Sequence, residues 1–259
     1  MTGLYGGSAV GQSLISRAMQ AARLGTKDAG DAVRRRRAPF TPPRRMWPDG
    51  VADFAAEGRE QVNLMIGLGK LSPEARMVEL GCGSGLRARS LTDWLGPGGL
   101  YDGLDADVRS VAWCDAAYAQ RMDFEFRHHE ALDQPLPVDD ATKDFVVMWA
   151  VLPQAAPELV VHLLRESRRV LLPEGRLFAS GYLLDAPAME AVERGGAEPA
   201  FAGRTVRGAQ APDGTHAQDE EWLLDRVAEV GFKTVGIRHG TWSGRADGRS
   251  VYDILVARL

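Results

Sequence analysis

The feature that most restricts the fold is the regular alternation of short apolar segments with amphipathic ones from residue 77 onward. The segment Phe145–Trp149 is continuously apolar, as expected of a strand that is buried on both faces. Such alternation requires a mostly parallel sheet with helices on both faces. We predict strands at 77–80, 100–104, 124–127, 144–151 and 176–184, and helices at 87–95, 108–120 and 157–172.

The flanking segments complete this organisation. Residues 8–24 and 49–68 have helical spacing of apolar side chains, and residues 25–45 between them combine an arginine run with prolines. Residues 185–218 show no periodicity and are long for a connection, so we expect a cap or substrate loop there. A helix at 220–230 and strands at 232–242 and 251–258 would close the sheet.

Composition and charge narrow the class of protein. The chain has 259 residues, 45% hydrophobic and 25% charged, which is ordinary for a soluble globular protein. It has no apolar run of the roughly 20 residues that cross a bilayer, and its two cysteines form no disulfide framework or metal motif. We therefore expect a cytoplasmic protein that has no metal and no membrane association.

The formal net charge of −4 conceals an asymmetry between the two ends. Residues 1–45 carry nine cationic and two acidic side chains, so the remainder of the chain is strongly acidic. A broad nucleic-acid interface needs a basic face, which this acidic body does not offer. We predict two parts, a basic arm or lid at 1–45 and an α/β domain at 46–259.

The segment Glu79-Leu80-Gly81-Cys82-Gly83-Ser84-Gly85 is the most informative motif. A predicted strand enters three glycines and then a helix, and such a turn lets a ligand approach the backbone at the helix N-terminus. Asp105 ends the next strand, where a carboxylate can accept hydrogen bonds from both ribose hydroxyls. The combination indicates an adenosine-containing ligand. The G-x-G-x-G spacing suits a methionine moiety better than the pyrophosphate of a dinucleotide.

With this motif the sequence resembles the class I S-adenosylmethionine-dependent methyltransferases, over about residues 46–259. The pieces occur in the family's order, and the Trp113-Cys114 pair and the Trp242–Arg245 turn are similar to those of bacterial members. Two departures are Glu174, where the family commonly has glycine, and Pro153-Gln154, where many relatives have histidine. The other segments that carry the likeness are Val78–Gly85, Gly103–Asp105, Glu130-Ala131, Leu136–Asp144 and Arg169–Arg176.

The resemblance implies a Rossmann-like, doubly wound, seven-stranded sheet with one antiparallel closing strand, and S-adenosylmethionine as cofactor. Glu79 would lie beside the methionine amino group, and Asp105 would bind the ribose. The loop beneath the sulfonium and ribose would consist of Gly81, Cys82, Gly83 and Gly85. The adenine would contact Ala106, Glu130 and Ala131, and the methionine end would contact Met148 and Trp149.

Methyl transfer requires an acceptor aligned with the S–CH3 bond and, for an acceptor of high pKa, a base. The sequence does not select a base among its histidines. We expect an oxygen, and less favourably a nitrogen, of a small molecule as acceptor, in bacterial natural-product biosynthesis; the enzyme would act alone or as a homodimer. Two alternatives stay open: an RNA or protein methyltransferase that uses the arm, and a cofactor-binding subunit without its own acceptor site. The histidines are His128, His129, His162, His216 and His239.

Overall fold

The computed structural model describes residues 38–259, without the side chains of 203 and 204. The predicted helix at 8–24 and the arginine run at 34–37 therefore lie outside the described residues. Of the predicted arm, only residues 38–45 are described, and they include a 3-10 turn, η1, that begins at Arg44 and ends at Met46.

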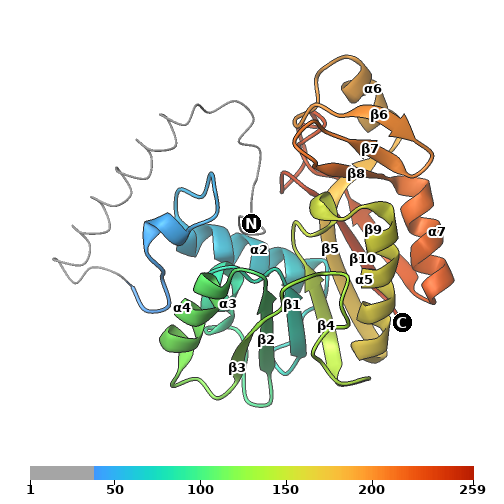
Figure 1. The fold of residues 1–259 in the computed structure, drawn as a ribbon. Coiled ribbons are helices and arrows are strands. Elements are labelled where there is room, and N and C mark those ends of the chain that lie inside the picture. The colour runs from blue at the N-terminus through green and yellow to red at the C-terminus, as the bar shows by residue number, and fades with distance from the viewer. Residues whose placement is uncertain (1–37) are drawn as a thin grey trace.

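The central sheet contains seven strands: β1 (Arg76–Leu80), β2 (Leu100–Asp105), β3 (Phe124–His128), β4 (Lys143–Met148), β5 (Leu171–Leu184), β9 (Lys233–Arg238) and β10 (Asp253–Arg258). Their order across the sheet is β3-β2-β1-β4-β5-β10-β9 (Figure 1). The first five are parallel to one another, and β10 is antiparallel to both of its neighbours. The predicted doubly wound sheet with an antiparallel closing strand is confirmed.

Helices cover both faces of this sheet (Figure 1). On one face lie α2 (Phe54–Gly67), α3 (Leu86–Leu91) and α4 (Val108–Tyr118), whose apolar side chains pack with Met77, Phe145 and Phe178. On the other face lie α5 (Pro157–Val170) and α7 (Glu220–Val230), packed with Val146 and Leu255. Because β4 contributes side chains to both cores, its continuous apolar sequence is explained.

Several element boundaries differ from the predictions for local physical reasons. Helix α2 begins at Phe54 rather than residue 49, because the Asp53 carboxylate caps it by accepting the Ala55 and Ala56 N–H groups, both at 2.9 Å. Helix α5 ends at Val170, and β5 starts at once with a register irregularity opposite Lys143. Helix α3 ends at Leu91, and the closing strands are shorter than predicted.

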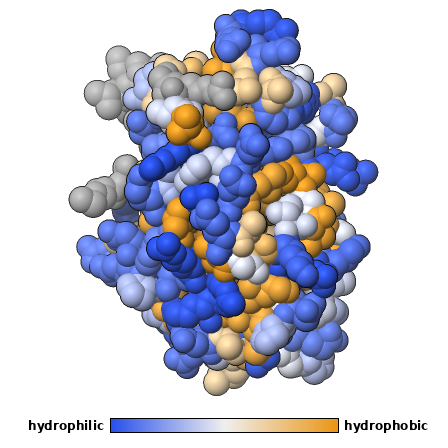
Figure 2. Space-filling model, turned by 90° about the vertical axis from the view of Figure 1, so that its right-hand side faces the viewer, coloured by the Kyte–Doolittle hydropathy of each residue, from blue (hydrophilic) through white to orange (hydrophobic). Residues whose placement is uncertain are grey.

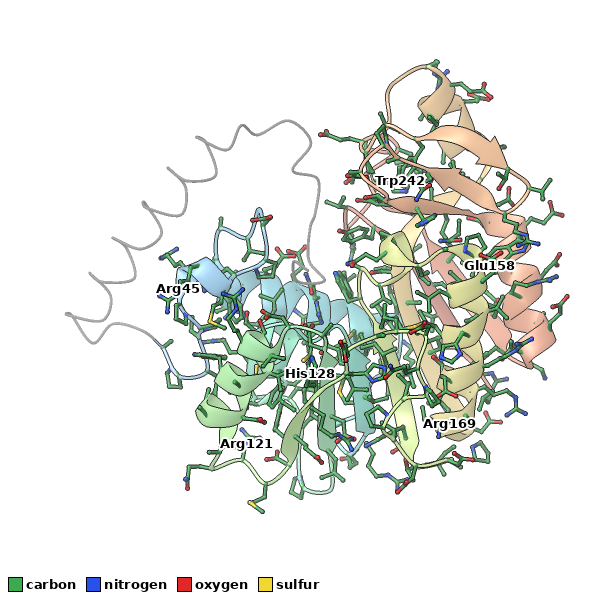
Figure 3. The ribbon with its side chains drawn as sticks, in the orientation of Figure 1. Arg45, Arg121, His128, Glu158, Arg169 and Trp242 are labelled. Atoms are coloured by element: carbon green, nitrogen blue, oxygen red, sulfur yellow. The ribbon has the colours of Figure 1, made fainter. Side chains whose placement is uncertain are left out.

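The segment at 185–218 is structured, which corrects the expectation of an irregular loop. It forms α6 (Ala186–Glu193), β6 (Ala202–Thr205), β7 (Gly208–Gln210) and β8 (His216–Asp219). Strand β8 pairs in parallel with the end of β5, at Tyr182 and Ala217, so the described residues form ten strands instead of the predicted seven. The Tyr182, Phe201 and Trp242 rings, 5.2–5.5 Å apart, form a small core with this extension. Trp242 lies beside the strands of the extension (Figure 3).

Strand β9 lies at the edge of the sheet, and all of its residues except Ile237 are exposed. Figure 2 shows the side of the molecule that carries α7, where apolar surface gathers near the middle of a largely hydrophilic face. Among residues 38–259, no helix combines the length and the apolar character needed to span a membrane.

Candidate functional site

The glycine-rich segment connects β1 to α3 through a tight backbone turn. Gly81, Gly83 and Gly85 have φ angles of 75°, 53° and 80°, in the left-handed region that favours glycine. The Gly81 and Cys82 N–H groups donate to the Leu104 carbonyl at 2.8 and 3.1 Å, which ties the turn to the end of β2. A side chain at Gly85 would also approach the Cys114 Sγ to 3.3 Å. The turn thus needs glycine both for its dihedral angles and for the space around it.

Asp105 lies at the carboxyl end of β2 and is 2% exposed. One of its carboxylate oxygens accepts the Gly83 N–H at 2.7 Å, and the other accepts the Asp107 N–H at 2.8 Å. Burial raises the pKa of Asp105, and these two backbone donors oppose that rise. A carboxylate has about four acceptor positions, so about two stay available for the hydroxyls of a ribose.

Glu79 is completely buried at the same edge of the sheet and is held by two donors. Its Oε1 is hydrogen-bonded and ion-paired to Arg87, and its Oε2 accepts the Tyr101 hydroxyl at 2.7 Å. Burial raises the pKa of the Glu79 carboxyl, and the Arg87 charge opposes the rise. Arg87 also donates to the Gln61 Oε1 at 2.6 Å and to the Gly81 carbonyl at 3.2 Å. Four elements therefore meet around one buried ion pair.

The remaining predicted contacts with the cofactor lie along the same edge. Residue Met148 is paired with Leu80 in the sheet, so Trp149 follows β4 next to the glycine turn, and its ring lies 5.8 Å from the Arg87 guanidinium. The Ala106 carbonyl is 3.2 Å from the His128 Nε2. Directly after β3, the His129 N–H donates to the Asp105 carbonyl at the end of β2, at 2.9 Å. The next two residues are Glu130, which is exposed, and Ala131, which is half-buried.

Both cysteines are buried beside the glycine turn. The Cys82 and Cys114 thiols contact the Gly83 carbonyl at 3.6 and 3.7 Å. Burial raises the pKa of both thiols, so neither is a thiolate at neutral pH. Both side chains fill space around the turn.

The segment that precedes α2 lies over this site. The Met46 carbonyl accepts the Ser84 hydroxyl at 2.7 Å, and the Phe40 ring stacks on Tyr118 at 4.5 Å. The Trp47 ring lies 5.5 Å from the ring of Phe54, and Phe54 is 1% exposed, so Trp47 packs against a core residue. This part of the chain covers the glycine turn from the side of α3 and α4.

A cavity of about 330 Å³ opens between α2, the end of β4 and the segment that leads into β10. Gln61 and Leu64 line it from α2, Trp149 lines it just after β4, and Tyr252 lines it just before β10. Its lining also includes two acidic side chains, Glu57 and Glu60, and one cationic side chain, Arg249. Because Gln61 and Trp149 also contact Arg87, the cavity adjoins the buried ion pair.

The five histidines occupy different environments. His129 is buried with no hydrogen-bond partner on its Nε2 among the described residues, and burial lowers its pKa. His162 lies in α5 with its Nε2 3.2 Å from the Gln134 carbonyl, and burial lowers the pKa of His216 in β8. His239 lies 3.5–3.7 Å from carboxylate oxygens of Asp185, Glu220 and Asp253.

Arg245 pairs with Asp185, the N-cap of α6. The interaction fixes the Trp242–Arg245 turn against the segment that follows β5.

Comparison with known proteins agrees with this geometry. Residues 77–175 match the family model described as "Methyltransferase domain". Residues 77–175 therefore carry a methyltransferase domain. It is an enzyme domain whose cofactor is S-adenosylmethionine, as the sequence resemblance implies.

Solved structures share the fold of the domain at low sequence identity. An S-adenosylmethionine-dependent methyltransferase from Mesorhizobium loti is 18% identical, with a TM-score of 0.56, and the match covers 78% of this chain and 99% of that one. The CcbJ methyltransferase from Streptomyces caelestis is 15% identical, with a TM-score of 0.57, and the match covers 81% of this chain and 93% of that one. The [4+2]-cyclase SpnF is 19% identical, with a TM-score of 0.58, and the match covers 92% of this chain and 93% of that one. Proteins that share this fold are thus named for different reactions, methyl transfer and [4+2] cyclisation.

Sequence reasoning did not find Gln61, Arg87 or Tyr101. Each comes from a different element and reaches the site only through tertiary packing. The one signal that could have indicated Arg87 is a charged residue two positions after the glycine turn, and it does not identify the partner of that residue.

Proposed function

We propose that this enzyme transfers the methyl group of S-adenosylmethionine to an oxygen, and less favourably to a nitrogen, of a small-molecule acceptor. The observation that carries the proposal is the junction of the glycine turn with Asp105, because it offers a cradle and a ribose-binding carboxylate at one sheet edge. We also propose bacterial natural-product biosynthesis as the setting of the reaction.

The residues at this edge fit the cofactor. Asp105 would hold the ribose, the loop Gly81–Gly85 would support the sulfonium and ribose, and Glu79 would hold the amino group. Ala106, Glu130 and Ala131 would surround the adenine, with Met148 and Trp149 at the methionine end. The bound cofactor supplies a methyl group that its sulfonium already activates, so these side chains have to bind, align and exclude water.

The cavity beside Trp149 is the proposed acceptor site. Its volume of about 330 Å³ suits a small molecule rather than a folded chain. It adjoins the methionine end of the proposed cofactor site through Gln61 and Trp149. The Glu57 and Glu60 carboxylates and the Arg249 guanidinium in the lining favour a polar acceptor.

Isothermal titration calorimetry with S-adenosylhomocysteine tests the cofactor site directly, and we expect saturable one-to-one binding. Acceptors are then screened by mass spectrometry for a gain of one methyl group. The absence of cofactor binding contradicts the proposal. Salt-dependent RNA binding that disappears on deleting residues 1–45 favours the nucleic-acid alternative, and turnover only with a second protein favours the subunit alternative.

A further inference from the structure

The buried Glu79–Arg87 pair is more elaborate than a cofactor-contacting acid requires. Both side chains are only 1% exposed, and neither charge is shared with solvent. Tyr101 donates to the second oxygen of Glu79, and Gln61 and the Gly81 carbonyl accept from the remaining guanidinium nitrogens. These contacts fix the positions of the Arg87 guanidinium and the Glu79 carboxylate.

We propose that Arg87 is a positioning residue that keeps Glu79 ionised and oriented, so that Glu79 can hold the ammonium group of the cofactor. The inference rests on the proposed cofactor site and deepens it. A carboxyl group buried at this depth without a counter-charge would take up a proton, and a neutral carboxylic acid offers no charge to an ammonium. With Arg87 beside it, Glu79 stays an anion and two of its lone-pair positions stay open.

The other groups near Glu79 do not replace Arg87. The Tyr101 hydroxyl donates a hydrogen bond but carries no charge, because burial raises its pKa far above neutrality. Asp105 and the Cys82 thiol lie nearby, and a negative charge on Asp105 disfavours ionisation of Glu79. Arg87 is thus the positive charge among the described groups that acts on Glu79. Its link to Gln61 extends the same network to the cavity wall.

The test compares two ligands that differ only in the amino-acid end. S-adenosylhomocysteine carries the ammonium, and 5′-methylthioadenosine has the same adenosine and thioether without it. We expect Arg87→Met to weaken S-adenosylhomocysteine binding roughly 10- to 100-fold at pH 7, with 5′-methylthioadenosine affinity within about twofold of wild type. Arg87→Lys keeps a positive charge and should recover part of the loss. Arg89→Met is the matched control, because Arg89 lies in the same helix and bonds to Thr41 instead.

The pH dependence separates positioning from a merely structural role. In Arg87→Met, the buried Glu79 loses its counter-charge and takes up a proton more readily, so S-adenosylhomocysteine affinity should decrease as the pH falls from about 8 to about 6 and stay flat in wild type and in Arg89→Met. Glu79→Gln should weaken the binding of S-adenosylhomocysteine without this pH dependence. The double variant with Arg87→Met should bind this ligand only slightly more weakly than Glu79→Gln alone.

Circular dichroism and the 5′-methylthioadenosine titration show whether each variant is folded. Equal weakening of both ligands by Arg87→Met, or a pH profile like that of wild type, overturns the inference. If Arg87→Met does not fold, the Arg87→Lys and Glu79→Gln comparison decides the same question. Failure of wild type to bind either ligand contradicts the proposed cofactor site instead, so the two failures are distinguishable.

Discussion

Helix α2 contains two glycines whose surroundings predict opposite responses to the same substitution. At Gly58, a Cβ atom would lie 2.2 Å from the Leu86 carbonyl oxygen, whereas ordinary contact begins at 3.4 Å. Since that oxygen belongs to the backbone at the start of α3, one of the two helices must move by about 1.2 Å. At Gly67, at the end of the same helix, a Cβ would meet nothing within 4 Å.

The magnitudes follow from these distances. Replacing glycine by alanine in a helix stabilises it by up to about 1 kcal/mol, and overpacking that moves backbone costs roughly 2–3 kcal/mol. We expect Gly58→Ala to lower the free energy of unfolding by about 1–2 kcal/mol and the Tm by about 2–8 °C. Gly67→Ala should raise the free energy of unfolding by about 0.5–1 kcal/mol. The same shift of α2 would draw Gln61 away from Arg87.

Urea and thermal unfolding of the two variants beside wild type measure these differences. A Gly58→Ala midpoint equal to or above that of wild type refutes the close approach of α2 to α3. The space around each glycine should decide whether alanine raises or lowers the free energy of unfolding. A Gly67→Ala variant that is destabilised as much as Gly58→Ala refutes this.

Three further predictions concern buried carboxylates. Asp105→Ala should weaken S-adenosylhomocysteine binding by about 1.5–3 kcal/mol, and unchanged affinity by calorimetry contradicts its place in the site. Asp253→Asn should lose about 1–3 kcal/mol of stability in urea, because the buried carboxylate accepts three donors, including the Trp242 indole at 2.6 Å; wild-type stability contradicts this. The hydrogen bond from Arg169 lowers the pKa of Glu166, so the stability that this carboxylate contributes is present at neutral pH and is lost as the pH falls through the lowered pKa. The difference between wild type and Glu166→Gln should therefore shrink below about pH 4, and a difference that does not change with pH contradicts the argument.

The small sheet after β5 shows why part of the fold was not predictable from sequence. Strands β6, β7 and β8 are three or four residues long and carry alanine, glycine and glutamine without alternation. Their stability depends on pairing with β5 and on the Tyr182, Phe201 and Trp242 rings, which come from three separate segments. No window of the sequence contains this information.

The sequence by itself determined the parallel sheet, the glycine turn and the position of Asp105, because periodicity and glycine conformation are properties of adjacent residues. Only the tertiary structure decided that Glu79 is paired with Arg87, that Tyr101 donates to it, and that Gln61 connects them to a cavity. These groups lie 8 to 26 residues apart in the chain. Their ionic interactions and hydrogen bonds are strong because the groups are buried together, and this burial exists only after the helices have packed on the sheet.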